Sequence, residues 1–362
     1  MRRRTLLATA AALLSTGCNE VVPDDLVPGD PTATPTDTPA NATGTPTPTD
    51  TPTRTERTER PTDTPTTPER NAARRIEAAR GHLADALATY VGFADGEDPT
   101  LLDMTMATPV SPAQVIRPVS DARRTLEALP AGASAAQQTT AQRLLGVAEF
   151  LAQSVHCHAA LRDARDEVAY IVGRLYAEQS GGLPSDVAQL RTYRSNAADR
   201  LAAIESNTSA DQMSALEGLG ADTWDAKVAQ FRQAIAAIGV FADSLPHVRR
   251  GFTAFNRAAS AYANRAYGTA VAEFRRTENE LQSAKVQLEA LDAPPALEEF
   301  RAHLVADCAD MAAAAADFRR AAEAGSRGLL PPQDAVAAGK DHLRDASQRV
   351  REFSGTVTLL RQ

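Results

Sequence analysis

The stretch that decides the fold class is AQRLLGVAEFLAQSVHCHAALRDARDEVAYIVGRLY, residues 141–176. Within it Phe150, Cys157 and Leu161 follow one another at intervals of seven and four residues. This spacing places their side chains on one stripe of an α-helix, where they can face a core. Helical spacing continues to the end of the chain with almost no run of β-branched residues. We therefore predict an all-α domain over residues 70–362.

Turn signals divide this region into about nine helices. Ser111-Pro112 is typical of a helix start, and Ser209 with Gln212 three residues later fits a capping box. Gly325 is typical of a helix end. Nine such helices would form a multi-helix bundle or a short α-solenoid. The expected ranges are 71–94, 112–129, 136–179, 186–206, 223–245, 247–266, 269–291, 295–325 and 333–354.

Parts of the region resemble each other, which favours two related halves, residues 70–206 and 223–362. Three landmarks recur in the same order at an offset of roughly 150 to 160 residues. Ala-rich helices produce chance matches easily, so the alternative is a helical domain without duplication. The landmarks are LEALP (126–130) and LEALDAPP (288–295), the long helices with Glu149-Phe150, Val155 and Cys157 and with Glu299-Phe300, Val305 and Cys308, and the turns at residues 182–186 and 330–334.

The first 17 residues have the features of an export signal peptide. Three arginines lie at its start, an apolar run reaches Leu14, and small residues precede Cys18. The apolar run is shorter than the roughly 20 residues that a membrane-spanning helix needs. We therefore predict a signal peptide over residues 1–17 rather than a spanning segment or a buried first helix.

A Thr/Pro-rich stretch separates this signal from the helical region. Residues 19–69 contain 16 threonines and 11 prolines, so they have almost nothing apolar to bury and cannot offset the entropy cost of ordering. Proline also favours extended backbone. We predict a disordered stalk over residues 18–69. Asn41 and Asn207 each begin an Asn-X-Ser/Thr triplet, which makes both candidate glycosylation sites in an exported protein.

The negative charge is concentrated on the stalk. The whole chain has a formal net charge of −8, and the stalk carries ten acidic residues against three arginines. This balance argues against a nucleic-acid partner, which would need a basic surface. It argues equally against strong attraction to an anionic membrane surface.

Two short motifs resemble those of known exported proteins. Arg3 and Arg4, followed by Thr5 and two leucines, resemble a twin-arginine export signal, and residues 15–18 resemble a lipobox ending at Cys18. With the stalk, they resemble surface lipoproteins of halophilic archaea. The resemblance implies a lipid on Cys18 and anchorage at the extracytoplasmic face of the membrane. The lipobox departs from the usual pattern, with serine where leucine is usual, so cleavage and secretion is the alternative.

Cys157 and Cys308 are the two cysteines of the helical region, and both lie on apolar stripes. We expect both to be buried, and an exported compartment permits a disulfide between them. The alternative is two separate thiols that act as small apolar side chains.

Metal ligands occur in two places, though neither makes a complete site. His156, Cys157 and His158 are consecutive, so on a helix they point in different directions and cannot share one ion. His303 and Asp307 lie four residues apart and can share a helix face, which makes them weak candidates for a metal site. A solvated His–Asp pair explains them equally well. No metal is therefore assigned.

No catalytic or cofactor motif occurs in the chain, so we predict neither an enzyme nor a bound cofactor. The leading hypothesis is a membrane-anchored extracytoplasmic lipoprotein that presents a helical protein-interaction module on a stalk. Its partner would be a protein or another envelope component. The alternative is a helical lipoprotein that binds a small molecule or metal ion and serves a transporter or a redox partner.

Overall fold

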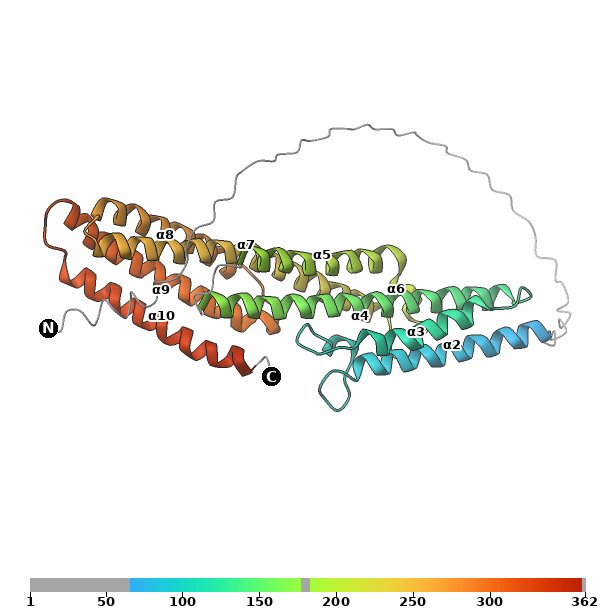
Figure 1. Ribbon diagram of the computed structural model, residues 1–362. Helices are drawn as coiled ribbons and strands as arrows, with labels where there is room; N and C mark the ends of the chain where they lie inside the picture. The colour runs from blue at the N-terminus through green and yellow to red at the C-terminus, as the bar shows by residue number, and fades with distance from the viewer. Residues whose placement is uncertain (1–65, 177–182, 360–362) are drawn as a thin grey trace, which may run out of the picture. The chain divides into compact units, whose positions relative to one another are not determined.

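The computed structural model describes residues 66–176 and 183–359. Every regular element in these ranges is a helix (Figure 1), which confirms the all-α prediction. Arg3, Arg4, Cys18 and Asn41 lie outside the described residues, as do the signal peptide and the stalk up to residue 65. The elements are α2 (Thr67–Val91), the 3-10 helix η1 (Leu101–Asp103), α3 (Pro112–Glu127), α4 (Ala135–Tyr176), α5 (Leu183–Asn207), α6 (Ala210–Met213), α7 (Ala221–Ala263), α8 (Tyr267–Glu289), α9 (Pro295–Ser326) and α10 (Gln333–Leu359).

The helical domain begins inside the Thr/Pro-rich stretch, four residues before the predicted helix start. The Thr66 N–H donates to Glu69 Oε2 at 2.6 Å, and the Glu69 N–H donates to Thr66 Oγ1 at 3.4 Å. These reciprocal bonds form a capping box, and Pro68 lies in the first turn, where it needs no helical partner for its nitrogen. This cap could not be recognised from composition, because threonine and proline are also the main residues of the stalk. The capping box predicted at Ser209 is confirmed, since the Ser209 N–H donates to Gln212 Oε1 at 3.0 Å.

Helix α7 is continuous, so the predicted break between residues 245 and 247 is wrong. Pro246 has no N–H, which leaves the carbonyl of Ala242 without its helical hydrogen bond. Arg191 of α5 donates to this carbonyl at 3.3 Å. The neighbouring helix therefore satisfies the group that the proline leaves unpaired, and the helix continues.

Helices that follow one another in sequence pack side by side (Figure 1): α2 with α3, α4 with α5, α7 with α8, α8 with α9, and α9 with α10. Helix α7 also packs against α5, α6 and η1. One main core extends from Ile76 in α2 to Cys308 in α9, so both predicted halves contribute to it. The duplication itself stays a prediction.

A smaller core joins α7, α8 and α9. Phe274 of α8 stacks on Phe318 of α9 with ring centroids 5.9 Å apart, and Phe255 of α7 meets Phe274 edge to face. Gly251 lets α8 approach α7 closely, because a Cβ at this position would lie 2.5 Å from Leu281 Cδ2. Together these contacts fix the relative position of α7 and α8.

No helix within residues 66–176 and 183–359 is both long enough and apolar enough to span a membrane.

Candidate functional site

The structure leaves Cys157 and Cys308 as free, buried thiols. Cys157 lies against α5, where its Sγ is 3.5 Å from the Ala197 carbonyl oxygen. Burial raises the pKa of both thiols to about 12, which makes them unreactive at neutral pH. Each packs in its own surroundings. The structure therefore favours two separate apolar fillers over the predicted bridge.

Asp307, one of the two weak metal candidates, belongs to a network that joins α4, α9 and α10, while His303 is partly buried on α9. Asp307 is buried and accepts hydrogen bonds from the Tyr176 hydroxyl and from Arg349 Nε, the latter at 3.1 Å. Burial raises the pKa of Asp307, although these two hydrogen bonds lower it. Arg349 also pairs with Asp310. Across the residues that the structure describes, no three metal-ligating side chains gather at one point, so His303 and Asp307 do not form a metal site with a third ligand.

His158 is a structural residue of the core. Its Nε2 lies 3.0 Å from the Thr108 carbonyl oxygen, which can only accept, so Nε2 carries the proton. The Tyr90 hydroxyl lies 3.2 Å from Nδ1 and donates to the Ser154 carbonyl oxygen, also at 3.2 Å, so it ties His158 and α4 to α2. Burial lowers the pKa of His158 to about 4, so the ring is neutral at pH 7. His158 therefore fastens the segment between α2 and α3 to α4, while Cys157 next to it faces α5.

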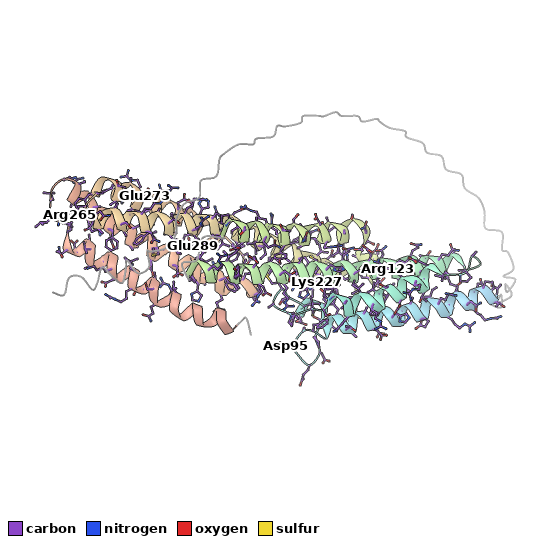
Figure 2. All side chains as sticks on the ribbon, in the orientation of Figure 1. Asp95, Arg123, Lys227, Arg265, Glu273 and Glu289 are labelled. Atoms are coloured by element: carbon purple, nitrogen blue, oxygen red, sulfur yellow. The ribbon has the colours of Figure 1, made fainter. Side chains whose placement is uncertain are left out.

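Sequence reasoning missed Lys227, which is fully buried on α7 (labelled in Figure 2). Its Nζ donates to the carbonyl oxygens of Leu101 and Met104 at 3.0 and 2.5 Å, and to Gln230 Oε1 at 2.7 Å. Burial lowers the pKa of Lys227 to about 7. Its spacing in the sequence indicates this burial, because Lys227 lies four residues before Phe231 and so falls on the apolar stripe of α7. Like His158, it holds the segment between α2 and α3.

A small cavity of about 90 Å³ lies beside these buried groups. Its lining includes His158, Gln230 and Phe231 together with Pro294 and Pro295. Ligand pockets are usually about 300 to 1,000 Å³, and a water molecule needs about 30 Å³, so this space suits a few water molecules. It does not favour a small-molecule site here.

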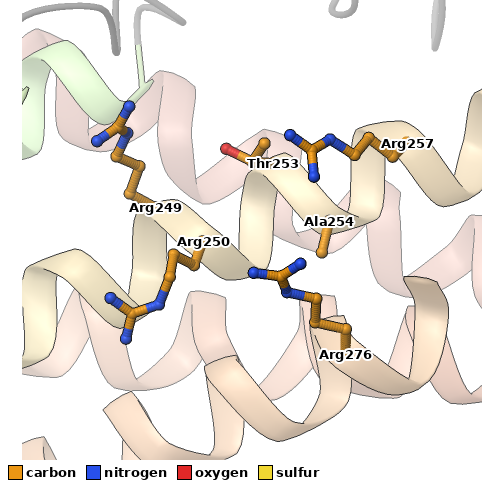
Figure 3. Close-up of a pocket in the computed structure, with 6 residues that line it drawn as sticks. All are labelled: Arg249, Arg250, Thr253, Ala254, Arg257 and Arg276. Carbon is orange, nitrogen blue, oxygen red and sulfur yellow. The ribbon is translucent and has the colours of Figure 1, made fainter. Parts of the chain in front are cut away.

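A second candidate site is a pocket of about 200 Å³ formed by α7 and α8, which we call the arginine pocket. It lies in a strongly basic part of the chain, because residues 249–276 contain six arginines and one acidic residue, Glu273. This basic stretch is present in the sequence, although the net charge of the whole chain is negative. The arginine pocket is lined by Arg249, Arg250, Thr253, Ala254, Arg257 and Arg276 (Figure 3).

Only one of the four arginines is held by a counter-ion. Arg250 Nε donates to Glu280 Oε2 at 3.0 Å, and its NH2 group lies 2.9 Å from His247 Nδ1. Within the described part of the chain, Arg249, Arg257 and Arg276 form no such ion pair. The arrangement therefore offers guanidinium donors, which bind carboxylate and phosphate groups in bidentate geometry.

Asn207, one of the two candidate glycosylation sites, is exposed as the last residue of α5, so it is accessible for modification.

No protein-family model, curated protein or solved structure matches this chain.

Proposed function

We propose that the protein is an exported lipoprotein, held at the outer face of the membrane by a lipid on Cys18, and that its helical domain binds a partner beyond the stalk. The observation that carries this proposal is the order of parts along the chain. Residues 1–17 have the features of an export signal and precede Cys18, a Thr/Pro stretch of about 50 residues follows, and a helix capped by Thr66 begins the folded domain. A fully extended stretch of this length would reach about 150 Å.

The arginine pocket supports the binding role. Exposed cations that lack counter-ions repel one another, so a cluster of them is costly unless an anionic group comes to neutralise it. The 90 Å³ cavity offers little room for a small-molecule ligand, so the arginine pocket is the feature that supports binding of a partner. The expected partner is an envelope component or protein that carries anionic groups.

The anchor has a direct test. Cys18→Ala should release the protein from the membrane fraction into the medium, because an acyl or ether lipid contributes about 0.8 kcal/mol for each CH₂ group that it buries in the bilayer. The measurement is fractionation of cells followed by detection of the protein in membranes and medium.

Cys157→Ala is the matched control, since it removes a thiol that is buried in the domain. This variant should stay in the membrane fraction. Equal membrane retention of Cys18→Ala and the wild type would contradict the lipid anchor.

A further inference from the structure

The arginine pocket retains positive charge because two nearby carboxylates of α8, Glu278 and Glu280, are already engaged in ion pairs. On α8, Glu280 binds Arg250 at 3.0 Å, and Glu278 binds Arg319 of α9 at 2.6 Å. Glu273 is the remaining acidic residue of the basic segment, and it does not line the pocket. Its Oε2 is buried without a hydrogen-bond partner, and within the described residues Arg249, Arg257 and Arg276 form no ion pair with it.

The donors of the pocket come from two helices that are fixed against each other. Arg249 and Arg257 are on α7 and Arg276 is on α8, and Figure 3 shows the side chains of Arg257 and Arg276 beside Ala254. The buried methyl group of Ala254 forms part of the floor, and the hydroxyl of Thr253 adds a neutral donor. Because Gly251 and the phenylalanine core hold α7 against α8, the arginine stems start from fixed positions.

We propose that the arginine pocket binds a phosphate group, either as inorganic phosphate or as a phosphomonoester on an envelope component. Two unpaired guanidinium groups, Arg257 and Arg276 on either side of Ala254 (Figure 3), call for a ligand with more than one negative charge. A phosphomonoester carries about −1.5 to −2 charges at pH 7 and has three acceptor oxygens, whereas a carboxylate carries a single charge. Guanidinium forks also match phosphate geometry. The inference rests on the proposed binding role and names the chemistry of the partner.

The test measures binding of inorganic phosphate to the purified full-length protein by titration calorimetry at low salt. Arg257→Ala/Arg276→Ala should weaken binding about 100-fold, since each charge-assisted bond contributes about tenfold. Arg143→Ala/Arg275→Ala is the matched control, because both residues are exposed helix arginines outside the pocket and the charge change is the same. The control should bind phosphate as the wild type does, within about twofold.

Acetate provides the comparison of charge, and it should bind at least about tenfold more weakly than phosphate. The absence of saturable phosphate binding by the wild type would overturn the proposal. Equal weakening in the pocket variant and the control would also overturn it, since the effect would then come from net charge alone.

Vesicles distinguish a lipid headgroup from free phosphate as the source of the group. The protein used is Cys18→Ala, so that its own lipid does not insert into the vesicle. Co-sedimentation with phosphatidylcholine vesicles that contain phosphatidic acid, but not with phosphatidylcholine alone, assigns a lipid monoester. Phosphate binding without co-sedimentation assigns a soluble phosphate or a phosphorylated glycan. These results are independent of the Cys18→Ala fractionation, so failure of the phosphate site would leave the anchor untouched.

Discussion

Lowering the pH from 6.5 to about 4 is expected to reduce the free energy of unfolding by about 3 kcal/mol through His158 alone. Burial holds the pKa of His158 near 4 in the folded protein, whereas the unfolded chain takes up a proton near 6.5. The unfolded state therefore binds more protons in this window, and stability rises with pH across it. The stabilising contribution is fully present above 6.5 and is lost at about 4.

Urea unfolding followed by circular dichroism at each pH measures this effect. His158→Gln keeps a side-chain donor for the Thr108 carbonyl but removes the titrating ring, so it should flatten the dependence between pH 4 and 6.5. His82→Gln is the control, because His82 lies on α2 away from this hydrogen-bond network. It should behave as the wild type. A steep acid dependence that survives in His158→Gln would show that other groups carry it.

Raising the pH from about 7 to 9 is expected to increase the free energy of unfolding by about 2 to 3 kcal/mol through Lys227. Burial lowers the pKa of Lys227 to about 7, while the unfolded side chain stays protonated up to about 10.5. The unfolded state again binds more protons, so stability rises with pH. Above pH 9 the trend should reverse, because Cys157 and Cys308 ionise in the unfolded chain while their folded pKa is about 12.

Lys227→Met isolates this contribution. Its total effect on stability combines two opposing changes: the desolvation cost of the ammonium disappears, and the Leu101 and Met104 carbonyls lose their donor at about 1 to 3 kcal/mol each. The slope between pH 7 and 9 depends only on the charge, so it should vanish in the variant. Lys285→Met is the control, since Lys285 forms a partly exposed pair with Glu289 and should leave the slope intact. An unchanged slope in Lys227→Met would contradict the role assigned to this lysine.

The sequence predicts the helices well wherever local signals decide the structure. The apolar stripe around Cys157 and the cap at Ser209 depend on neighbours three to seven residues away, and both are found. The predicted break at Pro246 was wrong because another helix compensates for the missing proline N–H. Arg191 donates a hydrogen bond to the Ala242 carbonyl that Pro246 leaves unpaired. No local pattern could supply that partner.

The candidate sites show the same division. The basic character of residues 249–276 is present in the sequence, but only the packing of α8 on α7 places Arg276 in one pocket with Arg257. Lys227 is similar, since its acceptors lie more than 120 residues away in the chain. Whether Cys157 and Cys308 pair also depends on packing, which leaves both as buried free thiols.

The most direct test of the account is photo-crosslinking next to the arginine pocket on native membranes. Ser260→Cys provides an exposed attachment point for a maleimide-linked photoreactive group one turn beyond Arg257 on α7, because Cys157 and Cys308 are buried. The account predicts an adduct with a membrane or envelope component. Both Arg257→Ala/Arg276→Ala and added inorganic phosphate should suppress this adduct, whereas Arg143→Ala/Arg275→Ala should leave it intact. Absence of an adduct, or the same adducts in all variants, would contradict a binding role for this pocket.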